Sequence, residues 1–244
     1  MMNAIEISNL KKSYNGVEAL KGITMHIQKG EFFALLGPNG AGKSTAISIF
    51  TGLTNKTSGE VKIFGRDVAA DYQEARSFIG LVPQEFNFDI FEKVYNILYY
   101  NAGYFNIPAK ERPQKIEIIL KQLGLWGKKN EPAQNLSGGM KRKLMIARAL
   151  IHDPKILILD EPTAGVDVET RQSIYNFLKE LNQKGTTILL TTHYLEEAEQ
   201  LCQRVAIINR GVVVKLAETQ KLLEEFGKSK KLEEIFIELT KGGA

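Results

Sequence analysis

The chain has 244 residues, of which 43% are hydrophobic and 25% are charged, and its formal net charge of +4 is too small and too dispersed to indicate a nucleic-acid-binding surface. Its single cysteine, Cys202, excludes a disulfide within the chain, while the length suffices for one large α/β domain or for a core with a smaller lobe. The sequence shows no signal-peptide pattern and no run of about 18 apolar residues, so we expect a cytoplasmic chain that does not itself span a membrane.

Alternating apolar and polar residues predict strands with one exposed face in the first part of the chain. The pattern occurs at 5–8, at 23–27 and at 61–64, and such strands typically form an antiparallel sheet. A predicted turn at 12–16 lies between the first two and carries Tyr14. The Tyr14 ring is either a stacking surface for a base or an ordinary turn residue, and the residues alone favour the second interpretation.

A glycine-rich loop follows a predicted buried strand at 32–36. Its residues are Gly37, Pro38, Asn39, Gly40, Ala41, Gly42, Lys43, Ser44 and Thr45. The loop precedes a helical pattern formed by Ile47, Phe50 and Leu53. A strand, a glycine-rich loop and a helix in this order are typical of a phosphate-binding loop.

The residue types of this loop suit a nucleoside triphosphate. Glycines at 37, 40 and 42 allow backbone geometries in which successive N–H groups turn toward phosphate oxygens. Lys43 can reach the terminal phosphates, the helix start adds its positive dipole end, and the Ser44 hydroxyl can ligate Mg²⁺. We therefore predict a nucleoside-triphosphate site at this loop.

The sequence changes character after a short apolar strand at 79–83 that ends at Gln84. Helical patterns follow as far as about residue 154. Proline and glycine separate them, at Pro108, Pro113, Gly124 and Pro132. This predicts a helical lobe inserted into the α/β core.

Eight aromatic residues fall between positions 86 and 105. Phe91, Tyr95 and Tyr99 follow helical spacing, and we predict that they serve the core of the lobe. Each remaining ring belongs either to that core or to an exposed patch that receives another protein, and for the group as a whole we predict the patch.

A second candidate anion site lies at the start of a later helix. Ser137 is a good N-cap, and Gly138 and Gly139 leave the first backbone N–H groups uncovered. This segment is either an anion-binding helix start or a capped helix that begins with small residues.

Two carboxylates follow a continuous apolar strand at 156–159. Ligands of doubly wound sheets bind at the carboxyl ends of such strands, so Asp160 can orient Mg²⁺ or its waters and Glu161 can accept a proton from an attacking water. A further buried strand at 188–190 leads to His193. We expect His193 to lie level with the carboxylates and to contact the terminal phosphate.

The end of the chain predicts a hairpin and a helix. Apolar runs at 205–208 and 212–214 flank a turn at 209–211. The last helix has one apolar face, formed by Leu232, Ile235, Phe236 and Leu239. We expect this face to pack on its own domain, the alternative being contact with a second chain or a membrane subunit.

With these motifs in order from about Ala4 to Leu239, the chain resembles the ATP-binding subunits of ABC transporters. Residues 37–45 match the family's Walker A motif, 156–161 match its Walker B motif and catalytic glutamate, and 136–140 match its signature.

The shorter motifs also match. Gln84 falls at the glutamine loop, which in the family senses Mg²⁺ and the membrane subunit, and 164–167 falls at the D-loop, whose Asp167 can cap a helix. His193 falls at the switch histidine and Tyr14 at the adenine-stacking aromatic. The resemblance changes the interpretation of Tyr14 to a base platform.

Two departures from the family pattern stand out. Met140 occupies a signature position where the family usually has glutamine, and the D-loop reads Ala-Gly-Val-Asp instead of Ser-Gly-Leu-Asp. Neither removes the groups that would touch phosphate, so we expect catalysis to survive. Together with the basic run 141–143 and the closing segment 232–240, they resemble the branch that serves bacterial exporters with a separate permease chain.

The resemblance implies an α/β fold built on a P-loop NTPase core with a mostly parallel sheet, an N-terminal antiparallel β subdomain and an inserted α-helical subdomain. The implied ATPase domain covers 1–226, with core segments at 1–84 and 155–226 and the helical subdomain at 85–154. A helical tail covers 227–244.

The resemblance also implies an ATPase that uses ATP and Mg²⁺. Glu161 would act as the base, and Lys43 and His193 would stabilise the transferred group. Ser44, Gln84 and Asp160 would hold the metal.

Two partners are implied, an integral membrane permease and a second ATP-binding subunit, while no nucleic acid is expected. In the family each signature, here Ser137, Gly138 and Gly139, caps ATP held by the other subunit. Because all motifs are intact on one chain, a homodimer is the simplest case. Its location would be cytoplasmic, peripheral on the inner face of the cell membrane.

Two alternatives remain at this point. An importer subunit shares every motif. A related ATPase of DNA repair, chromosome structure or translation is disfavoured, because only about 90 residues separate Ser44 from Ser137 without sustained heptads, and only one motif set is present.

Overall fold

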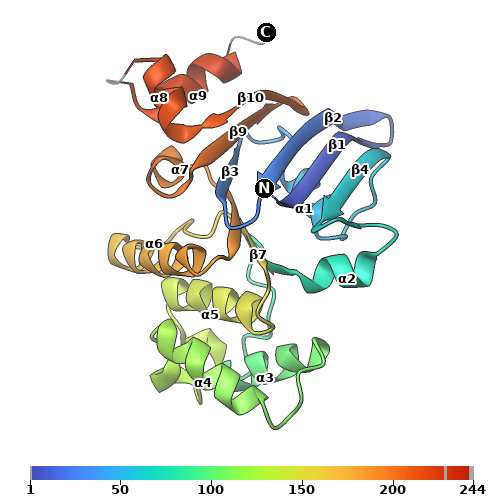
Figure 1. Ribbon diagram of the computed structural model, residues 1–244. Coiled ribbons are helices and arrows are strands. Elements are labelled where there is room, and N and C mark those ends of the chain that lie inside the picture. The colour runs from blue at the N-terminus through green and yellow to red at the C-terminus, as the bar shows by residue number, and fades with distance from the viewer. Residues whose placement is uncertain (1, 228–229, 242–244) are drawn as a thin grey trace.

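The computed structural model describes residues 2–227 and 230–241. It has an α/β fold with two sheets, a group of helices at one end and the C-terminal helices at the other (Figure 1). Among the described residues, no helix is both long enough and apolar enough to cross a membrane.

The N-terminal sheet is antiparallel and has the order β2-β1-β4-β5. Its strands are β1 (Asn3–Tyr14), β2 (Val17–Gln28), β4 (Ser58–Ile63) and β5 (Arg66–Asp67). The predicted antiparallel sheet is therefore confirmed. The predicted turn at 12–16 is wrong in extent, because β1 continues to Tyr14 and only Asn15 and Gly16 form the turn.

The larger sheet has the order β10-β9-β3-β8-β7-β6. Its strands are β3 (Phe32–Leu36), β6 (Ile79–Val82), β7 (Ile156–Asp160), β8 (Thr187–Thr191), β9 (Arg204–Asn209) and β10 (Val212–Glu218). All neighbours are parallel except β10, which returns antiparallel to β9 as the predicted hairpin. The fold class expected from the sequence is confirmed.

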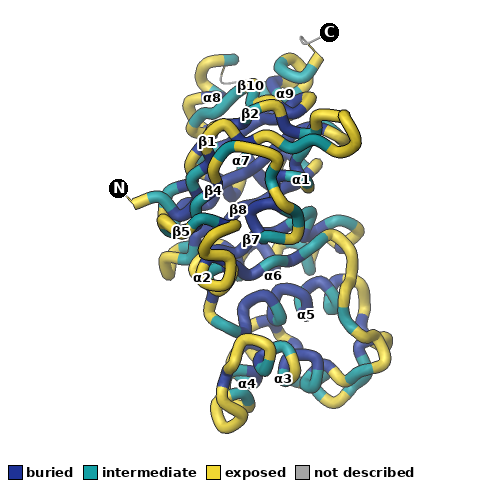
Figure 2. The backbone as a smooth tube through the Cα atoms, turned by 90° about the vertical axis from the view of Figure 1, so that its right-hand side faces the viewer, coloured by how far each residue is buried: buried dark blue, intermediate teal, exposed yellow. Residues whose placement is uncertain are grey.

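Both faces of the larger sheet are covered, which explains why its central strands are continuously apolar. Along β3, Phe32 and Leu36 face one core with the helices, whereas Phe33 and Leu35 face a second core shared with the N-terminal sheet. Figure 2 shows β7 and β8 buried in the middle of the molecule.

Helices flank the larger sheet, and two of those given next connect its strands directly, while the other two lie between one of its strands and a strand of the N-terminal sheet. They are α1 (Lys43–Phe50), α2 (Tyr72–Ser77), α6 (Val168–Gln183) and α7 (Leu195–Leu201). Asp167 caps α6, as predicted, and its Oδ1 accepts a hydrogen bond of 2.8 Å from the Thr170 N–H. Leu53 is not part of α1 as its spacing suggested, because the helix ends at Phe50 and Leu53 is 69% exposed.

The helical lobe lies at the lower end of the molecule (Figure 1). It contains α3 (Val94–Tyr104), α4 (Arg112–Gln122) and α5 (Gly138–Leu150), with short 3-10 turns at Trp126–Lys128 and Ala133–Asn135. Most of α5 is buried (Figure 2), and the helix packs against α3 and β6. Pro113 lies in the first turn of α4, where proline is tolerated, and so does not separate two helices.

The aromatic cluster of the lobe divides differently from the prediction. Tyr95 and Tyr99 pack against the core, but Phe91 precedes α3 and is 72% exposed. Helical spacing misled here because the helix begins only at Val94.

The C-terminal helices are α8 (Thr219–Glu225) and α9 (Leu232–Lys241). Leu232 and Ile235 are fully buried against the chain's own core, and α9 contacts α7 and β10. The expectation that this face packs on its own domain is confirmed. Positions 228–229 and 242–244 of the predicted tail lie outside the described residues.

Candidate active site

A cavity of about 670 Å³ lies at the carboxyl ends of the central strands. Four separate segments of the chain, together with one residue of β2, form its wall. The lining residues are Ala19, Asn39, Gly40, Gly42, Lys43, Ser44, Thr45, Gln84, Asp160, Glu161 and His193. The strands β3, β6, β7 and β8 carry these segments to one edge of the sheet because they run parallel.

The loop at 37–45 lines one part of the cavity, and glycine is required at two of its positions for different reasons. Gly42 is the N-cap of α1 with φ of 111°, a left-handed conformation that other residues rarely adopt. Gly37 does not have positive φ, but a Cβ there would lie 2.3 Å from the Ile208 carbonyl oxygen, so only glycine fits. Among the described residues no side chain caps α1, which leaves its first backbone N–H groups available to an anion.

Lys43 places a cation in the cavity wall although it is only 9% exposed. Its Nζ donates hydrogen bonds to the carbonyl oxygens of Gly37 at 2.7 Å and Pro38 at 3.1 Å. Burial lowers the pKa of Lys43, and the nearby carboxylates of Glu161 and Asp160 partly oppose this effect. A buried ammonium group whose hydrogen-bond partners are neutral oxygens is suited to a phosphate.

Glu161 is held in a strained backbone conformation directly after β7. Its φ is 51°, and its N–H donates a hydrogen bond of 3.0 Å to the carbonyl oxygen of Thr191 on β8. The carboxylate Oε2 accepts a hydrogen bond of 3.0 Å from Gln84 Nε2 and lies 3.2 Å from His193 Nδ1. The structure thus brings together three residues that are 77 and 32 positions apart in the chain.

The neighbouring carboxylate, Asp160, accepts a hydrogen bond from the Thr191 hydroxyl. It shares the cavity wall with Ser44 and Gln84. Mg²⁺ is usually held by one or two carboxylates together with substrate phosphates and water, so a serine hydroxyl, an amide and a carboxylate beside a phosphate-binding loop are a suitable donor set.

Some predicted site residues lie away from the cavity wall. Tyr14 is 44% exposed at the end of β1, with Lys12 Nζ 4.5 Å from its ring centre. The residues Gly37, Pro38 and Ala41 support the loop from behind its lining positions.

The signature residues also lie outside this wall. Ser137 caps α5, and its Oγ accepts a hydrogen bond of 3.3 Å from the Met140 N–H. Gly138 faces open space, whereas a Cβ at Gly139 would lie 2.7 Å from the Thr170 side chain. Gly138 therefore leaves the start of α5 accessible from outside the chain.

Two buried charged residues near the site were not predicted. Arg142 of α5 is 4% exposed and donates hydrogen bonds to the backbone of the glutamine loop. Its position, three residues before Met145 and seven before Ala149, places it on the buried face of α5, and that spacing was the available signal.

The second is Glu197, which is 1% exposed behind the His193 segment. It accepts hydrogen bonds from Tyr175 Oη at 2.8 Å and from the Thr163 hydroxyl. Burial, with the Glu197 carboxylate beside it, raises the pKa of Tyr175. Because Glu196 precedes it in the sequence, nothing in the pattern distinguished the buried glutamate from the exposed one.

Comparison with known proteins identifies a family and several relatives of this chain. A family model described as ABC transporter matches residues 20–164. The linearmycin resistance ATP-binding protein LnrL of Bacillus subtilis (strain 168) is 36% identical over 223 residues, which cover 91% of this chain and 72% of that protein. The Nod factor export ATP-binding protein I of Burkholderia thailandensis is 41% identical over 207 residues, covering 85% and 68% respectively.

Solved structures give the same result. An ATP-binding subunit of an ABC transporter matches with a TM-score of 0.88 and 28% identity, covering 97% of this chain and 99% of that one. A dimeric ATP-binding cassette in a post-hydrolysis state, bound to ADP and Pi, matches with a TM-score of 0.81 and 30% identity, covering 88% and 98%. The cavity, the family match and these relatives together show that the chain belongs to the ATP-binding subunits of ABC transporters.

Proposed function

We propose that this chain hydrolyses ATP, with Mg²⁺, to power export of a substrate through a separate membrane permease. The observation that carries the proposal is the shared cavity. It combines the phosphate-binding loop, the buried Lys43 ammonium and the Glu161 carboxylate held by Gln84 and His193.

In the proposed reaction a water molecule attacks the γ-phosphorus of ATP in line with the departing ADP oxygen. Glu161 accepts the proton of that water, and its bond to Gln84 fixes the carboxylate before the reaction. Lys43 leaves its two carbonyl partners to meet the terminal phosphates, and His193 donates to the transferred group.

Mg²⁺ would be held by Ser44, Asp160 and Gln84 beside the phosphates. When bound, it neutralises the charge on the phosphate oxygens. The Thr191 hydroxyl orients the Asp160 carboxylate for this role.

We propose that two copies of the chain complete each site. Ser137, Gly138 and Gly139 begin α5 with open backbone N–H groups but do not line the cavity of their own chain, which supports a role toward ATP bound by a partner subunit. The dimeric state of the solved cassette bound to ADP and Pi supports the same arrangement.

Tyr14 is proposed as the platform for the adenine base. Its ring is exposed, and its position at the adenine-stacking aromatic of the family supports this role. Because base stacking on an aromatic ring contributes about 1–3 kcal/mol, Tyr14→Ala should weaken ATP binding by that amount in a direct binding titration.

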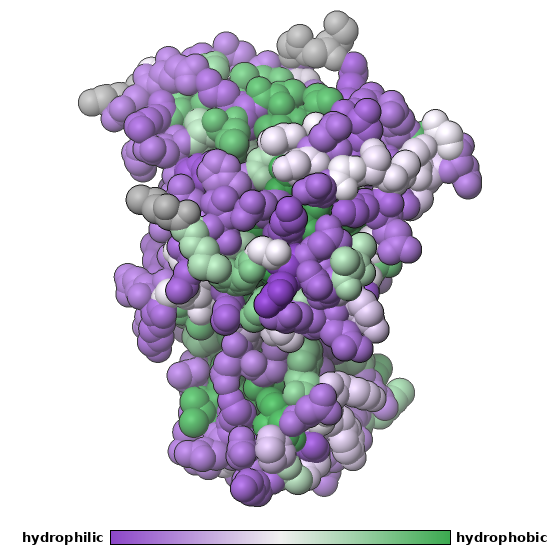
Figure 3. Space-filling model, turned by 45° about the vertical axis from the view of Figure 1, so that its right-hand side comes forward, coloured by the Kyte–Doolittle hydropathy of each residue, from purple (hydrophilic) through white to green (hydrophobic). Residues whose placement is uncertain are grey.

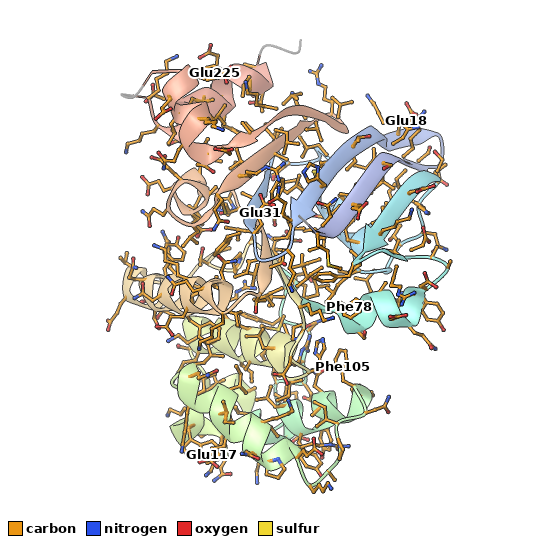
Figure 4. All side chains as sticks on the ribbon, viewed as in Figure 1. Glu18, Glu31, Phe78, Phe105, Glu117 and Glu225 are labelled. Atoms are coloured by element: carbon orange, nitrogen blue, oxygen red, sulfur yellow. The ribbon has the colours of Figure 1, made fainter. Side chains whose placement is uncertain are left out.

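A groove of about 320 Å³ between the lobe and the sheet core is proposed as the surface that receives the permease. Leu53 and Phe105 give it apolar character, and Arg76 and Arg148 give it charge. Figure 4 labels Phe105 at this junction, and Figure 3 shows separate apolar patches over the lower part of the molecule. Through this partner the chain would lie peripherally on the inner face of the cell membrane.

Export as the direction rests on the relatives, since one is a Nod factor export protein and another a linearmycin resistance protein. The division into a core at 1–84 and 155–226, a helical subdomain at 85–154 and a tail from 227 stays a prediction. The grouping of α3, α4 and α5 at one end of the molecule supports it (Figure 1).

The test begins with the tagged chain in gently solubilised membranes of its native host. A stoichiometric multi-span protein that co-purifies, together with ATP hydrolysis by the complex, is the expected result. Leu53→Glu should reduce this co-purification, whereas Ile237→Glu, which alters an exposed apolar residue of α9, should not. Recovery with ribosomes or DNA, and without a membrane protein, would contradict the proposal.

A further inference from the structure

The glutamine loop at 83–88 lies outside every helix and strand, yet its position decides whether Gln84 reaches Glu161. The segment follows β6 and leads into the helical lobe, and residues 84–87 are exposed. Two arginines of α5 contact its backbone: Arg148 donates a hydrogen bond of 2.7 Å to the carbonyl oxygen of Asn87, and Arg142 contacts the first residues of the loop.

Arg142 makes the contacts to the first residues. Its two terminal nitrogens donate hydrogen bonds of 3.0 Å to the carbonyl oxygens of Pro83 and of Gln84, and its guanidinium carbon lies 5.1 Å from the centre of the Phe86 ring. A planar guanidinium group donates to the two carbonyl groups from two separate nitrogens in a fixed fork, whereas an ammonium group has a single nitrogen on a flexible chain.

The arrangement is costly for a residue that only packs. Arg142 is 4% exposed, its buried Nε has no hydrogen-bond partner within the described part of the chain, and its other bonds go to neutral carbonyl groups. Burial lowers the pKa of Arg142, while the nearby Glu161 and Asp160 oppose the shift. An apolar residue of similar size would fill this position at least as well if packing were its only purpose.

The contacts continue from α5 to the reacting end of the site. Arg142 holds the Gln84 backbone, Gln84 Nε2 donates to Glu161 Oε2 at 3.0 Å, and that same oxygen lies 3.2 Å from His193 Nδ1. The helix that carries Arg142 begins at the signature residues. One series of contacts therefore joins Arg142, which lies four residues after Gly138 at the start of α5, to the catalytic carboxylate.

We infer that Arg142 is a positioning residue that fixes the glutamine loop to α5 and so keeps Gln84 on Glu161. The inference rests on the proposed ATP hydrolysis. It adds that the orientation of α5 and the reach of Gln84 are mechanically linked within a single chain.

The first experiment compares Arg142→Met with Arg142→Lys and with the matched control Lys143→Met. Lys143 lies next to Arg142 on α5 and donates instead to Ser173 of α6. Arg142→Met should lower kcat for ATP hydrolysis by about ten- to hundredfold, with the Kd for ATP changed less than about twofold, a difference close to negligible in free energy. Arg142→Lys should recover part of kcat, and Lys143→Met should match the wild type.

A double-mutant cycle identifies the route of the effect. If Arg142 acts through Gln84, the variant with both Arg142→Met and Gln84→Ala should be no slower than Gln84→Ala alone. If the double variant instead shows the product of the two single losses in kcat, Arg142 acts on the fold in general, and the inference would be wrong.

Hydrogen exchange supplies a measurement that does not depend on catalysis. Peptides covering 83–88 should exchange faster in Arg142→Met and in Arg142→Lys than in the wild type, with no change in Lys143→Met. If the wild type hydrolyses no ATP, the proposed function is wrong. Hydrogen exchange still tests whether Arg142 fixes the glutamine loop to α5. If Arg142→Met does not fold, the same two measurements are made on Arg142→Lys. The inference would be overturned if that variant had the exchange rate and the kcat of the wild type.

Discussion

At the scale of single residues, the Glu161 carboxylate has the most specific surroundings in the site. Its strained φ of 51° and its hydrogen bond from Gln84 aim one oxygen toward the cavity. Glu161→Gln preserves the shape of the side chain but removes the proton acceptor.

We therefore predict that Glu161→Gln binds ATP with unchanged affinity and hydrolyses it about 10²- to 10³-fold more slowly. Steady-state phosphate release and a separate ATP-binding titration check the two parts. Glu60→Gln, which alters an exposed carboxylate paired with Lys62, is the control and should behave as wild type. Near-normal turnover in Glu161→Gln would assign the base to another group.

A second prediction at this scale concerns His152 and the free energy of unfolding, not catalysis. Its ring stacks on Phe105 with centres 3.6 Å apart, and its Nε2 lies 3.1 Å from the Ile79 carbonyl oxygen. Burial lowers the pKa of His152, which the Ile79 bond and Asp153 oppose while Lys115 adds to the shift. The native state thus favours the neutral ring.

As the pH falls below the unfolded histidine pKa of about 6.5, the unfolded chain gains this proton before the native chain does, so stability decreases. We predict that the free energy of unfolding falls less between pH 7 and pH 5 in His152→Phe than in the wild type. Denaturant titrations at several pH values measure the difference. Equal pH dependence in both proteins would show that His152 does not contribute.

The residues of the site differ in how well the sequence could predict them. The glycine-rich loop, Asp160, Glu161 and His193 were predicted to meet because each follows a buried strand, and parallel strands end at one edge. Arg142 was missed because the target of a long side chain depends on which loop the fold brings beside it. Gly37 was predicted for backbone freedom, but close approach to Ile208 is the actual reason.

At the scale of elements, the contact between β6 and α5 sets the distance between the sheet and the helical lobe. Gly80 of β6 allows it, because a Cβ there would lie 2.3 Å from the Ala149 carbonyl oxygen and 3.0 Å from Pro154 Cγ. A backbone oxygen in a helix cannot move away cheaply.

We predict that Gly80→Ala lowers the free energy of unfolding by about 1–3 kcal/mol through overpacking. Gly127→Ala is the matched control, since a Cβ at Gly127 would meet none of the described residues within 4 Å and its φ is not positive. That change should be neutral or stabilising by up to about 1 kcal/mol. Urea unfolding of both variants provides the comparison, and equal midpoints would contradict the close-packing argument.

Strand and helix types were predictable from periodicity, whereas their ends were less so. β1 extends to Tyr14 because it stays paired with β2 up to Val17, a pairing that its polar residues do not reveal. Phe91 followed the spacing of a helix that begins three residues later, at Val94. Such boundaries are set by tertiary contacts, which local patterns do not contain.

At the scale of the whole molecule, the proposed dimer can be tested with two variants that are inactive alone and active only when they form a mixed dimer. Lys43→Ala should disable the phosphate loop, and Gly138→Asp should place a negative charge at the signature without steric conflict, since none of the described residues lies within 4 Å of a Cβ there. Each variant alone should be inactive.

Mixed in equal amounts, the two variants should recover about a quarter of wild-type hydrolysis, because half of the dimers are mixed and one of their two sites is complete. Phosphate release by the mixture and by each variant alone checks this. No recovery, from variants that each fold and exchange subunits, would place the signature outside the partner's site.

The place of β3 in the sheet also determines when the protein can fold during synthesis. This strand precedes the phosphate loop, and its five residues are all buried, yet its neighbours β8 and β9 begin only at residues 187 and 204. On the ribosome the strand therefore waits, unpaired and apolar, until more than three-quarters of the 244 residues have been made, and its second neighbour β9 follows later still. Nascent chains of this protein should accordingly bind chaperones until late in translation, and should become resistant to protease only after β9 has left the exit tunnel.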